Sequence, residues 1–360
     1  MEVQNPKISV LIPTYNRPHF LEQALESVVN QTLKPYECIV ADDNPNSKDS
    51  KRNYDVVEKF SQKYPFVIYH KNTKNLGPVD NVKHLINLAQ GEFLILLNDD
   101  DVLNPEALKL LAIPLLYDEK IKISAGRTLL VDENLNILNS PKFLRHYQIQ
   151  RKFFKNKVYD GKVFFKLSIN DMENYLGSFS GFMFRKKDID FDLFRYKNFE
   201  FKINIDWFFW LSLLRKGYIY LYDIFTYLFR IHGKNDNLNP EYTYLGYLTH
   251  LYFLSDEFLE YIGIEDRKIK VKENIEKIFL NVKNSYSYNS KKILGLYNEI
   301  FLSKVNYLSL ERLGFSIIII TYNSSQTILS CLESIKDSFL TAQDEIIIFD
   351  NNSKDNTVEL

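Results

Sequence analysis

The first hundred residues alternate short apolar runs with stretches in which apolar residues recur at helical spacing. The apolar runs occupy residues 8–12, 38–41, 66–69 and 93–97, with a further run at 121–125. The helical spacing is found at residues 20–29, 56–60, 82–86 and 105–117. Such alternation predicts an α/β fold with a parallel sheet covered by helices on both faces. The pattern weakens over residues 142–180 and becomes helical at about 240–310.

The composition excludes several classes of protein. The 360 residues are 45% hydrophobic and 25% charged, as in ordinary globular proteins. A formal net charge of -1 gives no whole-molecule field that would attract nucleic acid or an anionic membrane, so no nucleic-acid partner is expected and any anionic ligand must be bound by local features. The N-terminus lacks a signal-peptide pattern, and no apolar run approaches the ~18 residues of a membrane span. We expect a cytoplasmic protein, with peripheral association at the inner face of the plasma membrane left open.

An internal repeat lies near the C-terminus. Residues 318–323 are similar in sequence to residues 11–16, and residues 331–335 are similar to residues 24–28, at a constant offset of 307. The repeat predicts a second strand, helix, strand unit. Both cysteines, Cys38 and Cys331, fall in apolar patterns, which favours buried thiols over a disulfide or zinc framework.

The loop after the first strand, residues 13–18, contains no glycine. Dinucleotide sites and P-loops need a Gly-rich turn there, so a dehydrogenase and a P-loop enzyme are disfavoured. The second strand ends in Asp42 and Asp43, whose carboxylates could accept hydrogen bonds from a base or a ribose hydroxyl. An Asx turn before Pro45 is the alternative. Because Phe349 replaces Asp42 in the repeat while Asp350 matches Asp43, we prefer Asp43 as the ligand-facing residue.

Three consecutive carboxylates, Asp99, Asp100 and Asp101, follow Asn98 at the end of a fully apolar strand. Like charges this close destabilise a fold unless a cation neutralises them. Oxygen ligands favour Mg²⁺ or Mn²⁺, which could bridge a pyrophosphate and stabilise a departing nucleoside diphosphate. The alternative role is to cap the next helix, where Asn104 already stands before Pro105.

These motifs occur in a fixed order together with Asn75-Leu76-Gly77, Asn81 and Ala89-Gln90-Gly91-Glu92. In this order the chain resembles the family 2 glycosyltransferases of the GT-A fold, over roughly Lys7 to Gly233. The resemblance implies a Rossmann-like mixed sheet flanked by helices and an inverting transferase. It also implies a nucleotide-sugar donor, commonly a UDP-sugar, and Mn²⁺ or Mg²⁺ as cofactor.

The resemblance also implies site residues. Those expected at the nucleotide are Pro13, Thr14, Tyr15, Asn16, Asp43, Asn75, Gly77, Asn81 and Asp99. Those expected at the metal are Asp100, Asp101, which flanks the motif, and His232, which follows Arg230-Ile231. A structural role is the alternative for His232. Two positions depart from the family pattern: Asn98 stands where an aspartate is usual, and Asp80 stands where an arginine is common. The segment from Gly177 to Phe182 resembles the wall between donor sugar and acceptor; its glycines could equally be turn residues.

Inverting transfer needs one base for the acceptor hydroxyl. Asp206, followed by four aromatic residues, is the candidate by the same resemblance; a first-turn aspartate of a helix is the alternative. Asp188, Asp190 and Asp192 are reserve candidates. Trp207 and Trp210, at helical spacing, favour a core position over sugar stacking.

Three segments are therefore expected: residues 1–235 as a GT-A catalytic domain, 236–313 as a helical extension or linker, and 314–360 as the N-terminal fragment of a second GT-A domain. The acceptor is expected to be a glycan or a lipid-linked molecule in polysaccharide or cell-envelope synthesis. Two other classes stay open. One is a non-catalytic nucleotide-sugar-binding module, and the other is a phosphohydrolase with an aspartyl nucleophile, for which Asp99 and Asp101 have the right separation. The sequence predicts no oligomeric state.

Overall fold

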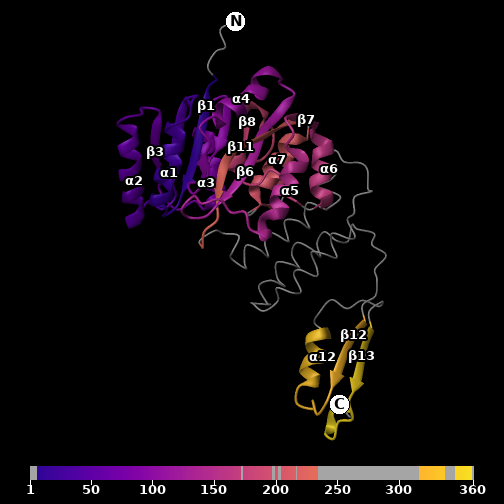
Figure 1. The fold of residues 1–360 in the computed structure, drawn as a ribbon. Helices are drawn as coiled ribbons and strands as arrows, with labels where there is room; N and C mark the ends of the chain where they lie inside the picture. Colours follow the sequence, from indigo (N-terminus) through magenta and orange to yellow (C-terminus); the bar gives the residue numbers. More distant parts are fainter. Residues whose placement is uncertain are drawn as a thin grey trace. The chain divides into compact units, whose positions relative to one another are not determined.

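The computed structural model describes residues 6–233, apart from 172, 197–198, 202–203 and 216, and residues 316–336 and 345–358. The predicted helical extension, 236–313, lies outside the described residues. The chain divides into two compact units, one ending at Tyr297 and the other beginning at Asn298. Each unit is described by itself. Figure 1 shows the elements of both.

The N-terminal unit is built on a mixed sheet in the order β3-β2-β1-β4-β8-β6-β11-β5, with β7 also paired to β11. Four strands are parallel: β1 (Ile8–Thr14), β2 (Glu37–Asp42), β3 (Val67–Lys71) and β4 (Phe93–Leu96). Next comes β8 (Phe182–Arg185), antiparallel to β4 and to β6 (Ile121–Val131). Last, β11 (Tyr218–Arg230) is parallel to β6 and antiparallel to β5 (Val102–Leu103) and β7 (Lys157–Asp160).

The parallel arrangement predicted from the alternation is therefore right for β1 to β4 and wrong beyond them, since β8 runs the other way between β4 and β6. The mixed sheet implied by the family resemblance is what the structure has.

Helices cover both faces of this sheet. On one face α1 (Pro18–Val29), α2 (Lys48–Ser61) and α4 (Ala107–Tyr117) pack against Val10 and Ile12 of β1. On the other face α3 (Pro78–Leu88), α5 (Leu144–Phe153), α6 (Gly161–Asp171) and α7 (Ile205–Leu214) share a core with Leu11. Neighbouring residues of β1 thus face opposite layers, as the two-residue period of a strand requires.

The start of α4 differs from the prediction. The helix begins at Ala107, two residues later than expected, and Glu106 occupies its N-cap position without a side-chain cap. The Asn104 side chain instead accepts a hydrogen bond from the backbone N–H of Glu106 at 3.1 Å, which closes a turn before the helix. Pro114 lies inside the helix.

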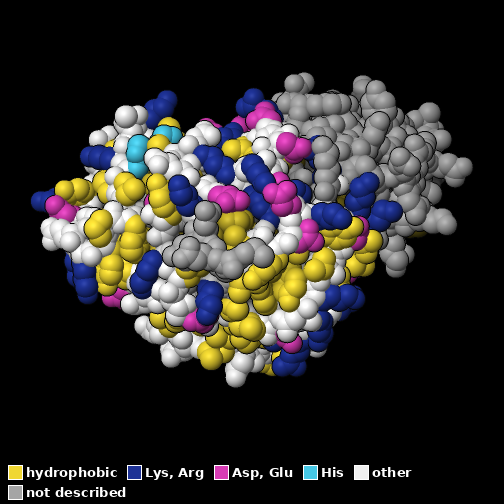
Figure 2. Space-filling model, turned by 90° about the horizontal axis from the view of Figure 1, so that it is seen from above, with side chains coloured by type: hydrophobic (Ala, Val, Ile, Leu, Met, Phe, Trp, Pro, Cys, Tyr) yellow, Lys and Arg dark blue, Asp and Glu magenta, His cyan; other side chains and the backbone are white. Residues whose placement is uncertain are grey.

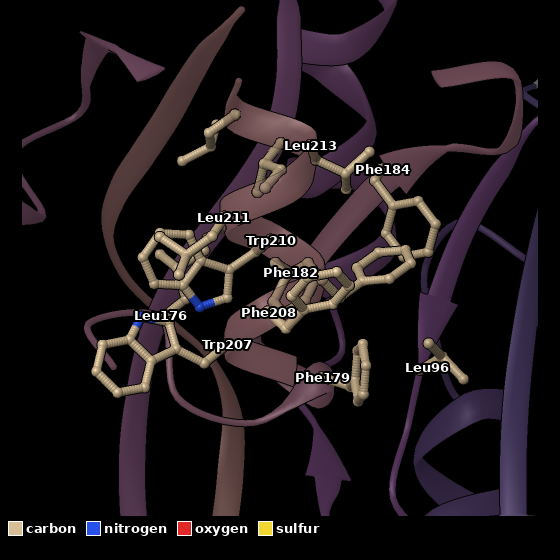
Figure 3. Close-up of a cluster of buried hydrophobic side chains, with 14 of the residues drawn as sticks. Leu96, Leu176, Phe179, Phe182, Phe184, Trp207, Phe208, Trp210, Leu211 and Leu213 are labelled. Atoms are coloured by element: carbon tan, nitrogen blue, oxygen red, sulfur yellow. The ribbon is translucent and has the colours of Figure 1, made fainter. Parts of the chain in front are cut away.

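The apolar helix α7 is buried on all sides from Trp207 to Leu214. Figure 3 shows its side chains packed among Leu176, Phe182 and Phe184. The core position predicted for Trp207 and Trp210 is confirmed, because 1% and 0% of their surfaces are exposed. Their indole N–H groups donate to the Ser168 hydroxyl and to the side-chain oxygen Oδ1 of Asn174, at 3.0 and 2.9 Å. None of the described helices is both long and apolar enough to cross a membrane.

The C-terminal unit contains β12 (Ser316–Thr321), α12 (Ile328–Lys336) and β13 (Glu345–Asp350), with the two strands parallel. It repeats β1, α1 and β2, with one difference in register. Thr14 pairs with Asp42 in the first unit, whereas Thr321 pairs with Asp350, which matches Asp43. Cys38 is buried as predicted, but Cys331 is exposed. The prediction is wrong there because the described part of this unit has one α-helix, a short 3-10 helix and two strands, which bury little surface.

Candidate active site

The predicted site residues come mainly from loops that follow β1, β2 and β4, which are parallel neighbours and so end at the same edge of the sheet. The loops after β1 and β4 are joined directly. The Thr14 hydroxyl donates to Asp99 Oδ2 at 2.7 Å, and the backbone N–H of Tyr15 donates to the same oxygen at 3.4 Å. Both Thr14 and Asp99 are buried. Burial raises the pKa of Asp99 to about 7, against the opposing charge of Arg17.

Asp100 stands between two cationic or potentially cationic groups. The Arg17 guanidinium forms an ion pair with Asp100 Oδ2 and lies 3.3 Å from Asp99 Oδ1. His232 Nε2 lies 3.1 Å from the same Asp100 oxygen, and its ring packs on Phe20 with centroids 4.9 Å apart. Burial alone would raise the pKa of Asp100, but the His232 hydrogen bond and the Arg17 charge hold it below its usual value. Asp100 is therefore an ionised carboxylate facing an imidazole.

Asp101 is turned toward the protein. Its oxygens accept hydrogen bonds from the Ser180 and Ser178 hydroxyls at 2.7 and 3.3 Å, the Asn98 amide at 3.2 Å and the backbone N–H of Arg230 at 3.1 Å. Burial, and then the charge of Asp100, raise its pKa to about 8. Asp101 thus holds in place the segment of residues 98–101, here called the acidic loop. Its predicted role as a metal ligand stays a prediction.

Arg230 is a residue that the sequence reasoning quoted but gave no role. Its side chain is fully buried and donates to the backbone oxygens of Asp100 and Glu133 at 2.7 and 2.6 Å and to Gln23 at 2.6 Å. The guanidinium also lies over the Phe20 ring, 4.7 Å from its centroid. Arg230 therefore fastens the end of β11 to the acidic loop and brings His232 beside Asp100.

Asp43 orders the loop that follows β3. Its carboxylate accepts hydrogen bonds from the Asn72 amide at 2.8 Å and from the backbone N–H groups of Leu76 and Gly77 at 2.7 and 2.8 Å. Gly77 has φ of +81°, a conformation suited to glycine, and the Asn75 side chain also accepts from its N–H at 2.9 Å. These donors bring Asp43, Asn75 and Gly77 together.

The remaining predicted nucleotide residues lie in different surroundings. Asn81 is buried, accepts a hydrogen bond from the Asn72 amide and donates one to the backbone oxygen of Ala41. It therefore helps to position Asn72, which binds Asp43. Asn16, with φ of +56°, accepts from Asn44 and Ser47 and so joins the loops after β1 and β2. The Tyr15 side chain is 45% exposed, and Pro13 is half-buried. Of these four, Tyr15 offers a ligand the most accessible surface.

Asp206 lies in the first turn of α7. Its carboxylate accepts from the Asn174 amide at 3.1 Å and the backbone N–H of Trp207 at 2.8 Å. Burial raises its pKa to about 6. Asp188 and Asp190, two of the reserve candidates, form ion pairs with Lys122 and Arg215, each at 2.8 Å. Asp206 has the raised pKa expected of a general base.

The segment from Asn174 to Ser180 connects Asp206 with the acidic loop. Asn174 binds Asp206 at one end, and Ser178 and Ser180 bind Asp101 at the other. Gly177 has φ of +73°, a conformation suited to glycine, and a Cβ there would make a tight contact of 3.1 Å with the Tyr227 hydroxyl. Asn174 was missed by the sequence reasoning, because nothing local in the sequence marks it.

The fit to a divalent cation can be judged from the donors present. Among the described residues, no three His, Cys, Asp or Glu side chains form a ready-made metal site. Asp100 and His232 supply two suitable donors, and a positive group, Arg17, already lies against Asp99 and Asp100. Mg²⁺ is usually held by one or two carboxylates together with water and substrate phosphates. The residues present therefore fit an ion completed by a bound diphosphate.

Comparisons with known proteins agree with the motifs. A sequence profile described as glycosyl transferase family 2 matches residues 9–176 and 316–360. An uncharacterised glycosyltransferase of Methanocaldococcus jannaschii is 31% identical over 160 residues, 44% of this chain and 54% of that protein. The GalNAc(5)-diNAcBac-PP-undecaprenol beta-1,3-glucosyltransferase of Campylobacter jejuni is 40% identical over 106 residues, 29% of this chain and 33% of that protein. The matches thus span about half and a third of these relatives.

A solved structure has a similar fold. Residues 1–349 of Staphylococcus aureus TarS superpose with a TM-score of 0.51 at 20% identity, covering 78% of this chain and 72% of that one. The same TarS fragment in complex with UDP gives a TM-score of 0.50 at 18% identity. The likeness shows a shared architecture of a mixed sheet flanked by helices.

Proposed function

Because this chain belongs to glycosyl transferase family 2 and has the GT-A fold, we propose that it transfers a hexose-type sugar, with inversion, from a UDP-sugar to an acceptor hydroxyl. The proposed acceptor is a glycan or a lipid-linked precursor of a cell-envelope polysaccharide, and the protein would act at the inner face of the plasma membrane. UDP is the ligand of the TarS complex, and the Campylobacter relative is named for an undecaprenol-linked acceptor. Residues 314–360 are proposed as part of a second GT-A domain, as the second profile match suggests.

One observation carries the proposal: the Asn174–Ser180 segment links two groups suited to this reaction. At one end, Ser180 binds Asp101, next to the ionised Asp100 and its partner His232. At the other end, Asn174 binds Asp206, which has the raised pKa of a base. Asp100 and His232 would hold Mn²⁺ or Mg²⁺. When bound, that ion supplies charge stabilisation to the departing nucleoside diphosphate. Asp206 accepts the proton of the acceptor hydroxyl, and Asn174 orients its carboxylate. Asp43, Tyr15 and the loop from Asn75 to Gly77 bind the nucleoside.

The phosphohydrolase alternative loses support from Asp101. A nucleophilic carboxylate needs an oxygen open to the substrate, whereas four donors surround Asp101. The oxygens of Asp99 are also engaged, one by Thr14 and Tyr15 and the other by Arg17. The other alternative, a binding module without catalysis, predicts that the protein binds a nucleotide sugar but does not turn it over. Incubation with UDP-sugars, Mn²⁺ and candidate acceptors should release UDP, and binding without release over a broad acceptor panel would favour the module.

Asp43→Ala should weaken UDP binding by about 10- to 100-fold, because a hydrogen bond to a charged group is worth about 1.5–3 kcal/mol. Isothermal titration calorimetry with UDP and Mn²⁺ measures the affinity. Since Asp43 also orders Leu76 and Gly77, Asp43→Asn serves as the companion variant that keeps the size of the side chain. Unchanged UDP affinity in Asp43→Ala would contradict the nucleoside role.

Asn174→Ala should move the acid limb of the pH–rate profile to higher pH. The base is active when ionised, so kcat/KM should rise with pH through about 6, the pKa of Asp206. The Asn174 amide stabilises the charged form of Asp206, and its loss raises that pKa further. The profile of kcat/KM against pH is the measurement. A uniform loss of rate with an unmoved acid limb would assign Asn174 to the packing of Gly177 and Trp210 alone.

A further inference from the structure

One part of the N-terminal unit is strongly basic. Between residues 151 and 166 there are six cations and a single acid, Asp160, so this segment carries +5 in a chain whose net charge is -1. The cations are Arg151, Lys152, Lys155, Lys157, Lys162 and Lys166. The rest of the chain therefore carries -6. Figure 2 shows Lys and Arg side chains over the face that it draws, among them a group along the lower right margin.

The segment forms one compact piece of structure: the end of α5, strand β7 and the start of α6. The Tyr159 hydroxyl donates to the backbone oxygen of Phe153 at 2.7 Å. The Phe164 ring packs against both, with centroids 5.7 and 5.9 Å away. Because these aromatic side chains form the inner side, the cations between them are left outside. All six are exposed except Lys166, which is half-buried.

The charge of this surface is not neutralised within the described part of the chain. There, none of the six cations forms an ion pair, whereas Lys59, Lys83 and Lys187 each pair with a glutamate. The one acid, Asp160, accepts a hydrogen bond from the backbone N–H of Val163 at 3.1 Å and so serves the start of α6. As far as the described residues go, these cations are therefore available to an anionic partner.

The composition of the surface distinguishes between anionic partners. Five of the six cations are lysines, which act as point charges, whereas arginine is the residue suited to bidentate recognition of individual phosphates. Two valines beside the lysines, Val158 and Val163, are 41% and 54% exposed. Lysines with exposed apolar side chains match a bilayer, which offers anionic headgroups above an apolar layer.

We propose that Arg151–Lys166, here called the basic surface, docks on an anionic lipid membrane. Helix α6 packs against α7, since Trp207 donates to Ser168, and α7 carries Asp206. Docking would thus hold the candidate base near the membrane, where a lipid-linked acceptor is found. That last step rests on the proposed function, whereas the membrane binding does not.

The test is cosedimentation of the full chain with vesicles of phosphatidylcholine, with and without phosphatidylglycerol. Each lysine near an anionic surface contributes about a fivefold gain in partitioning. The variant Lys155→Glu, Lys157→Glu, Lys162→Glu should therefore bind phosphatidylglycerol vesicles at least about a hundredfold more weakly than the wild type. The matched control is Lys48→Glu, Lys51→Glu, Lys63→Glu, which makes the same charge change on exposed lysines elsewhere and should keep most of the binding.

A second variant, Val158→Ser with Val163→Ser, tests the apolar contribution and should also weaken vesicle binding. Equal losses in the two lysine variants, or no binding of the wild type to phosphatidylglycerol vesicles, would overturn the proposal. So would binding to soluble polyphosphate as tight as binding to vesicles, combined with no effect of the valine changes, which would assign the surface to a polyanion. UDP release with a soluble acceptor is measured on the same variants and should be unchanged, so failure of the membrane proposal is distinguishable from failure of the proposed function.

Discussion

Asp206→Asn should lower kcat by about 10²- to 10⁴-fold while leaving the affinity for the donor nucleotide unchanged, which is the range that general base catalysis contributes. Asparagine has the size of aspartate and can still accept from Trp207, so the first turn of α7 keeps its structure. It cannot take the proton of the acceptor hydroxyl. The measurements are UDP release at saturating donor and acceptor, and calorimetry with UDP.

Asp192→Asn is the matched control, because Asp192 is an exposed aspartate in the segment before α7. It should turn over at the wild-type rate. If Asp206→Asn also kept the full rate, Asp206 would be a structural residue of α7 and the base would have to be sought elsewhere.

Asp100→Ala should weaken Mn²⁺-dependent UDP binding by at least about a hundredfold, since loss of an outer partner of a metal ligand alone typically costs 10- to 100-fold. The variant removes the carboxylate that lies beside His232. Of the two carboxylates beside Arg17, only that of Asp99 then remains. Calorimetric titration of UDP at several Mn²⁺ concentrations measures the effect, and circular dichroism checks that the variant is folded.

Asp55→Ala, which removes an exposed carboxylate from α2, is the control for general charge effects and should bind UDP as the wild type does. If Asp100→Ala and the wild type responded equally to Mn²⁺, the ion would not be held by Asp100. A loss of UDP binding in Asp100→Ala that persists without any metal would point instead to displacement of Arg17.

The elements that could be predicted are those whose burial follows a simple period. Strands β1 to β4 each contain a short apolar run, and α1 and α3 carry one apolar face each, so local sequence is enough to identify them. The stretch 142–180 gave no such pattern. Its apolar residues, such as Phe153, Phe164 and Tyr175, pack on one another across α5, α6 and the loop that follows, and this arrangement exists only in three dimensions.

The candidate site likewise has a part that local sequence predicts and a part that it does not. Acidic residues after β4 and β2 could be expected at one edge of the sheet, because parallel strands end together. What could not be predicted is how they are held. The Arg230 guanidinium reaches the backbone of Asp100 across 130 positions, and Asn174 reaches Asp206 across 32. Only Arg17 had a local signal, as a cation two residues after Tyr15 in the loop already expected at the donor.

The central claim is that the acidic loop binds a nucleotide sugar through a divalent cation. A thermal-shift screen of nucleotide sugars, each with Mn²⁺ and with EDTA, tests it without knowledge of the acceptor, since a ligand that binds the folded state raises its apparent stability. At least one UDP-sugar should raise the melting temperature with Mn²⁺ and not with EDTA, and Asp100→Ala should abolish that rise. No shift with any nucleotide sugar in Mn²⁺, or an equal shift in EDTA, would contradict the claim.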